Sequence, residues 1–235
     1  MIWQILIGII ITFLLTISIR IVIAKNPNPK RLLKTIKSTV DIILWALSPD
    51  YKIAKIQKNK LCSSQEKNAE NNNNSDRIQN TRADYIKIAN ANNLIFTLII
   101  TFITCTIFML FKNDWIYNIS IGLIGYRLCS RTIEINISFI KDILSKEKKS
   151  SLKRIERIKL AFTSLIEEAI LFAGIYTVMM KNICVAILGA LHSFVLSPVS
   201  FCQSNAFGNF LALYQVICTI ILLTISFASY ISSSD

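Results

Sequence analysis

The sequence is poor in the residues that build most metal and catalytic centres. It has one histidine, His192, and none of its six cysteines forms a Cys-x-x-Cys pair. This scarcity excludes the usual transition-metal clusters. Ser193 and Ser197 lie near His192, but no strand–turn–helix elbow surrounds them, so a hydrolase is not expected. A phosphate-binding glycine loop is also missing. We predict no enzymatic activity, no cofactor and no metal site.

Acidic residues are also scarce, with 14 Asp and Glu against 26 Lys and Arg, which gives a net charge of +12. A basic chain of this kind is a candidate for binding nucleic acid. However, its basic residues do not interleave with aromatic residues, and the sequence contains no helix-turn-helix or zinc-finger pattern. We therefore predict no nucleic-acid partner and look for another origin of the charge.

Long apolar runs are abundant. Apolar residues make up 53% of the chain, and several runs approach the roughly 20 residues that cross a bilayer. We predict an all-α integral membrane protein with about five transmembrane helices. The first span is expected within residues 1–24, the second and third within 94–140, and the last two within 160–231. The individual spans are 2–24, 94–111, 115–140, 161–180 and 207–231.

The basic residues are concentrated in two connections. Thirteen lie between residues 25 and 87, within the segment 25–93, and eight lie in 141–159. By the positive-inside rule both segments are cytoplasmic, the N-terminus is outside and the tail 232–235 is cytoplasmic. We expect a plasma or cytoplasmic membrane location, with anionic headgroups as the partner of these charges. Within 25–93, residues 29–48 predict an amphipathic surface helix and 59–82 a disordered linker.

Residues 160–231 have the layout of an ion-channel pore module. Between the last two spans lies a dip, 184–206, which is too short and too polar to cross and so returns to the outer side. Its run Ser-Phe-Val-Leu-Ser-Pro-Val-Ser-Phe-Cys-Gln at 193–203 resembles the pore helix and filter of the potassium-channel pore-loop family. The run Phe-Gly-Asn-Phe-Leu-Ala-Leu-Tyr-Gln at 207–215 is similar to the start of that family's inner helix.

The resemblance implies a pore helix over 185–196, a homo-oligomer that is a tetramer by analogy, and a degenerate filter. Ser200 and Cys202 stand where the family has glycines, and ordinary residues resist the backbone angles that turn filter carbonyls inward. We therefore expect weak selectivity among monovalent cations. Cys184 and Cys202 share the predicted outer side, where they either pack as small apolar residues or pair. The filter-like residues are Ser197, Pro198, Val199, Ser200, Phe201, Cys202 and Gln203.

Polar residues share one face of the last span, at Gln215, Thr219, Ser226 and Tyr230. Such a stripe lines an aqueous pore or marks helix packing, since Ser and Thr in membrane helices often bond backbone carbonyls. Both interpretations remain open at this point. No glycine follows Gly208, so the inner-helix hinge of many channels is absent.

Charged residues interrupt the third and fourth spans. Arg127, Arg131 and Glu134 fall on one helical stripe, and the fourth span contains Glu167 and Glu168. Adjacent residues on a helix point about 100° apart, so at most one of these acids faces Arg127 or Arg131 squarely. We interpret the set as an ion-pair network that locks the two helices together. A proton or ion relay is the alternative.

Three functional hypotheses follow from these patterns. The first is a weakly selective monovalent cation channel formed by an oligomer around the loop 184–203. The second is a non-conducting descendant of such a module that serves as a membrane interaction or regulatory subunit, because its filter is degraded. The third is a small transporter that uses Glu167 or Glu168.

Overall fold

The computed structural model describes residues 2–23, 48–49, 53, 74–111, 113–144, 151–192 and 206–223. These residues contain helices and no strand, which confirms the predicted all-α class for this part of the chain. A short π-helical turn at 221–223 extends the last helix. The helices are α1 (Ile2–Ile23), α5 (Asn74–Phe111), α6 (Asp114–Leu144), α7 (Arg154–Met180), α8 (Ile183–His192) and α9 (Ala206–Ile220).

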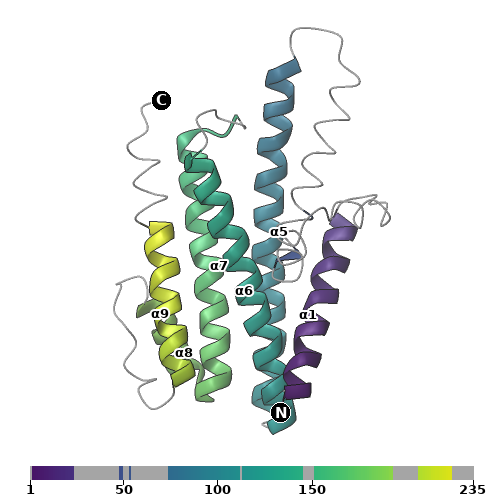
Figure 1. The fold of residues 1–235 in the computed structure, drawn as a ribbon, viewed down its shortest axis with the longest axis vertical. Coiled ribbons are helices and arrows are strands. Elements are labelled where there is room, and N and C mark those ends of the chain that lie inside the picture. Colours follow the sequence, from purple (N-terminus) through teal and green to yellow (C-terminus); the bar gives the residue numbers. More distant parts are fainter. Residues whose placement is uncertain are drawn as a thin grey trace.

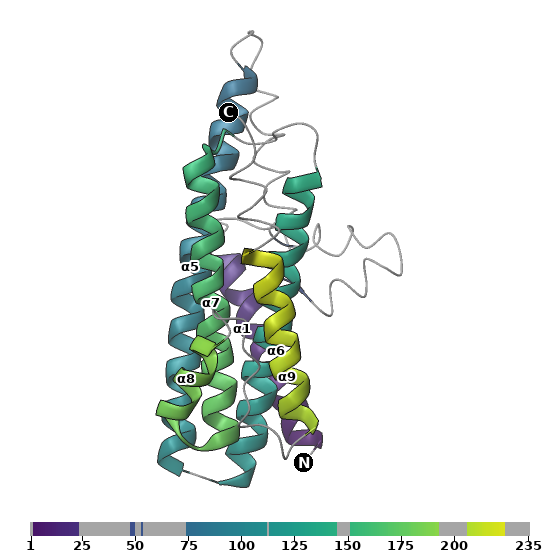
Figure 2. The ribbon, with the colours of Figure 1, turned by 90° about the vertical axis from the view of Figure 1, so that its left-hand side faces the viewer.

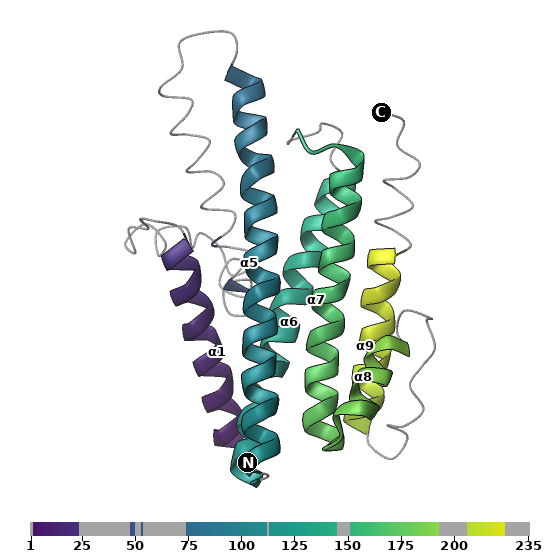
Figure 3. The ribbon, with the colours of Figure 1, turned by 180° about the vertical axis from the view of Figure 1, so that it is seen from behind.

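The helices form an elongated bundle whose members run roughly along one axis. In Figure 1, α5, α6 and α7 lie side by side, with α1 on one flank and α9 on the other. The view from behind shows the same order reversed (Figure 3). The short helix α8 lies beside α7 at the end of the bundle where α7 ends and α9 begins (Figure 2). An apolar cluster that includes Ile124, Leu171 and Phe172 forms the core between α6 and α7.

Helices α1 and α6 approach closely because glycine stands on both sides of their contact. A Cβ on Gly8 would collide with the carbonyl oxygen of Ile119, and one on Gly122 with the carbonyl oxygen of Ile5. The absence of side chains therefore lets the two backbones touch. Thr12 Oγ1 donates a hydrogen bond to the Leu123 carbonyl across the contact, at 3.2 Å.

Helix α5 corrects the predicted boundary of the linker. Residues 59–82 were expected to be disordered because they are polar, but the chain is helical from Asn74 onward and continues without a break to Phe111. Two contacts hold this polar half of α5. The Ala83 side chain is buried, and Lys87 Nζ lies 2.7 Å from Glu156 Oε1 at the start of α7. Low hydrophobicity alone did not predict these tertiary contacts.

The ends of the two basic segments lie together at one end of the bundle. The Lys87–Glu156 ion pair joins them, and the Ser151 amide donates to the Gln79 carbonyl at 3.5 Å. The amphipathic helix predicted over 29–48 lies outside the described residues except for Ser48. The buried Ser48 hydroxyl donates a hydrogen bond to the Ser130 carbonyl on α6 at 2.9 Å.

Many polar side chains are buried in this bundle, while many large apolar side chains lie on its surface. Among the described residues, 20 polar or charged side chains are buried beside 21 apolar ones, while 30 large apolar side chains are exposed. The exposed residues form continuous faces, such as Ile95, Leu98, Ile99 and Phe102 on α5. A patch of this size marks a surface that contacts protein or lipid instead of water.

The predicted number of transmembrane spans is supported only in part. Among the described helices, one stretch, Gln79–Phe111, is long and apolar enough to cross a membrane by length and composition. The apolar stretches Ile2–Ser18 and Phe207–Leu223 are shorter. The helices α6 and α7 carry the buried charges described below. The structure thus shows one such helix in an all-helical bundle, and not five.

Candidate functional site

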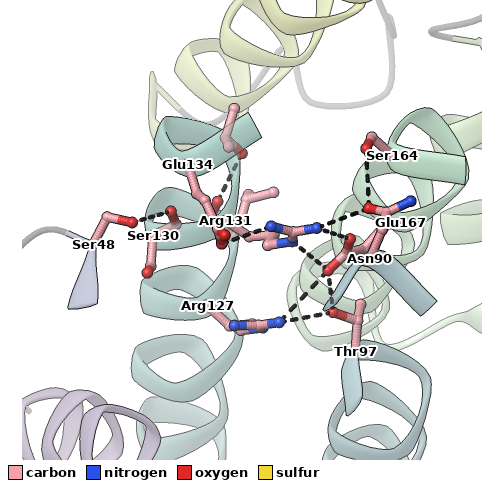
Figure 4. A network of polar contacts seen from close by, with 11 residues as sticks. Ser48, Asn90, Thr97, Arg127, Ser130, Arg131, Glu134, Ser164 and Glu167 are labelled. Atoms are coloured by element: carbon pink, nitrogen blue, oxygen red, sulfur yellow. Dashed lines mark hydrogen bonds and ion pairs between the residues drawn. The ribbon is translucent and has the colours of Figure 1, made fainter. Parts of the chain in front are cut away.

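A network of charged and polar side chains lies at the centre of the bundle, between α5, α6 and α7 (Figure 4). Its strongest contact joins α6 to α7. Arg131 Nε donates to Glu167 Oε1 and Arg131 Nη2 to Glu167 Oε2, both at 2.7 Å. This two-point geometry is the strongest form of an arginine–carboxylate pair. Arg131 Nη1 also lies 2.6 Å from Glu134 Oε2, one turn further along α6.

Helix α5 completes the shell around Glu167. The Thr97 hydroxyl donates to Glu167 Oε1 at 2.8 Å, and Arg127 Nη2 approaches the same oxygen at 3.5 Å. The Arg127 guanidinium lies over the Phe96 ring, 4.7 Å from its centroid, in a cation–π contact. Arg127 and Glu167 are fully buried. Glu167 therefore links three helices through charge-assisted hydrogen bonds.

The amide of Asn90 extends the network along α5. Its Oδ1 accepts from Arg131 Nη2 at 3.3 Å and from the Ser164 hydroxyl of α7 at 3.4 Å. Two arginines from successive turns of α6 thus face one acid of α7, Glu167. The structure brings together Arg127, Arg131, Glu134 and Glu167, four of the five charged residues that the sequence singled out. Asn90, in the asparagine-rich run 90–93, and Thr97, in an apolar stretch, were missed, because an uncharged polar residue gives no signal of its partner in the sequence.

Glu168, the fifth charged residue, lies apart from this hydrogen-bonded set. Its side chain is 2% exposed, and neither carboxylate oxygen has a hydrogen-bond partner among the described residues. It lies near α9 instead, where Tyr214 and Cys218 interact with its charge. Burying a carboxylate without compensation costs several kcal/mol, so this group stands out from the paired Glu167.

Gln215 and Thr219, the two predicted pore-lining residues that lie on α9, face the interior of the bundle. The Gln215 side chain is buried; its Nε2 donates to the Ala190 carbonyl of α8 at 3.1 Å, and its Oε1 accepts from the Tyr176 hydroxyl of α7 at 2.7 Å. Thr219 is buried as well. Gln215 therefore satisfies one of the last carbonyls of α8, which a helix leaves without an internal partner. Ser226 and Tyr230 lie outside the described residues.

The reversal between α7 and α8 has a local cause. Lys181 adopts the left-handed conformation with φ 55°, and its amide donates to the Thr177 carbonyl at 2.9 Å, which ends α7. Asn182 Oδ1 then accepts from the Cys184 and Val185 amides at 3.0 and 3.3 Å and caps the start of α8. An asparagine directly before an apolar run is a helix-start signal that the sequence analysis did not use.

The short helix α8, Ile183–His192, overlaps the range 185–196 that was expected for the pore helix, and residues 193–196 lie outside the described residues. The filter-like residues Ser197 to Gln203 lie outside the described residues, as does Cys202, the possible partner of Cys184. Cys184 itself is exposed and carries a free thiol.

Known proteins give no further guidance on the site. Comparisons with protein-family models, curated proteins and solved structures find no match to this chain. Among the described residues, no group of three or more His, Cys, Asp or Glu side chains is arranged to hold a metal ion. The chemistry available at the site is therefore that of buried ion pairs and of one unpaired carboxyl group.

Proposed function

We propose that this chain is a channel-like integral membrane protein, built around a re-entrant helix, that assembles as a homo-oligomer and passes monovalent cations with weak selectivity. The observation that carries the proposal is α8. It begins directly after α7, spans 10 residues and is followed by α9, which starts at the same end of the bundle. Ten helical residues extend about 15 Å, half of the roughly 30 Å hydrocarbon core.

The burial of the α8 side chains supports insertion of this helix halfway into the membrane. Ala186 and Ala190 are buried against the bundle, while Ile187, Leu188 and Leu191 are exposed to the surroundings. The hydrogen bond from Gln215 to Ala190 fixes the C-terminal part of α8 beside the third turn of α9. A helix that enters from outside in this way points its partially negative C-terminal end toward the membrane centre, where it favours a cation.

The outer surface supports insertion into a bilayer. The apolar half of α5 is about 27 Å long over residues 94–111, close to the thickness of the hydrocarbon core, and its exposed residues are apolar except for Thr106. Burial of the charge network in the interior agrees with this assignment, since lipid offers charged groups no solvation. Under the positive-inside rule, the basic end of the bundle is cytoplasmic and Cys184 is outside.

The topology is tested by labelling single cysteines from the outside. In intact cells, a membrane-impermeant maleimide is expected to modify a variant that retains only Cys184. A matched variant that retains only Cys62, in the cytoplasmic segment, is expected to react only after permeabilisation. Labelling of Cys62 and protection of Cys184 in intact cells would overturn the proposed orientation.

Conduction is tested with purified protein in liposomes that hold a potassium or sodium gradient. We expect a cation flux that Val199→Asp or Ser200→Trp alters, since both substitutions change the filter-like segment. Glu156→Gln, on the surface of α7, is the matched control and leaves the flux unchanged. An absence of flux, or flux unaffected by the filter substitutions, rejects the channel.

One observation favours a second candidate, a non-conducting membrane subunit. The polar residues Gln215 and Thr219 face the interior of the subunit, and the outward face of α9 is apolar except for Asn209. Such a face suits lipid or a neighbouring helix better than a water-filled pore. The outward residues are Phe207, Phe210, Leu213, Ile217 and Ile220. An assembled oligomer that carries no flux would support this candidate.

A further inference from the structure

Glu168 is the one carboxylate among the described residues whose two oxygens are both buried and without a hydrogen-bond partner. The titratable groups around it come from three helices. Glu167 precedes it on α7, Arg131 faces it from α6, and Tyr214 and Cys218 face it from α9. The nearest cation, Arg131, is already held at 2.7 Å by both oxygens of Glu167.

Within the central set of Arg127, Arg131, Glu134, Glu167 and Glu168, the charges do not balance if Glu168 is ionised. The other buried cation among the described residues, Arg157, lies at the start of α7, where its Nε donates to the Leu152 carbonyl at 3.2 Å. Arg127 and Arg131 supply two positive charges, while Glu134, Glu167 and Glu168 would supply three negative ones. Arg131 pairs with Glu134 and Glu167, and Arg127 contacts Glu167. The excess charge falls on Glu168, at a depth where an uncompensated ion costs several kcal/mol. A proton on this carboxylate would balance the charges of the set.

We propose that Glu168 is a proton-binding site, and that the missing positive charge is an exchangeable proton held at neutral pH. An alkali cation would need several oxygen ligands, as hard cations do, whereas the α9 side of Glu168 offers the Tyr214 hydroxyl, the Cys218 thiol and one amide oxygen, that of Asn136. A proton needs a single acceptor. Asn136 Oδ1 is buried, has no partner and lies on the same side, since Asn136 Nδ2 is 4.0 Å from Cys218 Sγ.

Release of this proton changes the contact between α7 and α9. The interior then carries one uncompensated negative charge beside Tyr214 and Cys218, which favours entry of water or separation of α9 from α7. The site thus makes the position of α9 dependent on pH. This inference goes beyond the proposed function, because it concerns the protonation of one subunit and holds whether or not the oligomer conducts.

Infrared spectroscopy of the full-length protein in detergent tests the proposal. At neutral pH, we expect the C=O stretching band of a protonated carboxylic acid, which ionised carboxylates lack. Titration to alkaline pH is expected to remove the band. The band is lost in Glu168→Gln and shifted in Glu168→Asp, a variant that keeps the carboxyl group. Glu156→Gln, which removes an exposed carboxylate from the same helix, leaves the band unchanged.

Three results would contradict the proposal. A wild-type spectrum without the band at neutral pH overturns the proposal, whatever the variants do. A band that remains unchanged in both Glu168 variants assigns the proton to another group and also overturns it. If potassium or sodium at constant pH removes the band in proportion to its concentration, the site binds an alkali cation and not the proton alone, which likewise contradicts the assignment.

Discussion

On the side of α7 that faces α5 and α6, Glu167 accepts hydrogen bonds from Arg131 and Thr97 and lies close to Arg127. On the side near α9, the adjacent Glu168 accepts none among the described residues. Both side chains are almost fully buried. Neighbouring residues on a helix point about 100° apart. A step of one residue along α7 therefore moves a carboxylate from a site with several hydrogen-bond donors to a site where its oxygens have none among the described residues.

This difference in hydrogen bonding indicates different roles for Glu167 and Glu168, which the sequence alone does not distinguish. The Glu167 carboxylate, which accepts from two guanidinium nitrogens at 2.7 Å, joins α7 to α6. A carboxylate without donors has no partner that requires its charge, so it is free to gain or lose a proton. An ion-pair network and a proton or ion relay were alternatives for the whole cluster. The comparison favours the ion-pair role for Glu167 and the proposed proton-binding role for Glu168.

The largest effect is expected from Glu167→Gln. This substitution removes the carboxylate that Arg127 and Arg131 share deep inside the bundle. Breaking a buried ion pair from one side costs about 3–5 kcal/mol. We expect a large fall in the thermal unfolding temperature in detergent, or a loss of folded protein on purification.

Glu168→Gln is the matched control for that experiment, one position along the same helix. Glutamine resembles the protonated carboxyl group in shape and charge, so the expected change in stability at neutral pH is small. If Glu168→Gln destabilises the protein as much as Glu167→Gln, the two environments are equivalent and the comparison fails.

An intermediate loss of stability is expected from Gln215→Leu. This substitution tests a buried polar side chain on α9 that makes two hydrogen bonds. Leucine removes both the bond to the Ala190 carbonyl and the acceptor of the Tyr176 hydroxyl. Leaving buried polar groups unsatisfied costs about 1–3 kcal/mol. Thermal unfolding in detergent measures the loss. Leu213→Ala, on the outward face of α9, is the control and should change stability by less than about 0.5 kcal/mol.

Much of the fold was predictable from the sequence, because hydrophobic run length and helical spacing are local properties. They predicted the helical class, the stripe of Arg127, Arg131 and Glu134, and a short segment between the last two long helices. The choice between Glu167 and Glu168 was not predictable, because it depends on the rotation of α7 relative to α6 and α9. The helical start of α5 was missed because its stabilising contacts, at Ala83 and Lys87, come from distant parts of the chain.

The role of Gln215 was also beyond sequence reasoning. A glutamine on a polar stripe is equally compatible with a water-filled pore and with a partner inside the subunit. Only the position of α8, set by the turn at Lys181 and Asn182, brings the Ala190 carbonyl within reach of its amide. Polar residues of membrane helices therefore need the packing of the neighbouring element before a function is assigned to them.

The smallest effect is expected from Glu156→Gln, which tests an ion pair at the solvent-exposed end of the bundle. The hydrogen bond from Lys87 Nζ, followed by that from the Lys153 amide, holds the pKa of Glu156 below its usual value. A carboxylate with a lowered pKa stabilises the fold above its unfolded-state pKa, and this contribution is lost as the pH falls through the folded-state pKa. We expect Glu156→Gln to reduce the unfolding temperature slightly at neutral pH and not at all in acid, and high salt to weaken the difference. If Glu156→Gln lowers the unfolding temperature as much as Glu167→Gln does, burial does not determine how much an ion pair contributes to the stability of this protein.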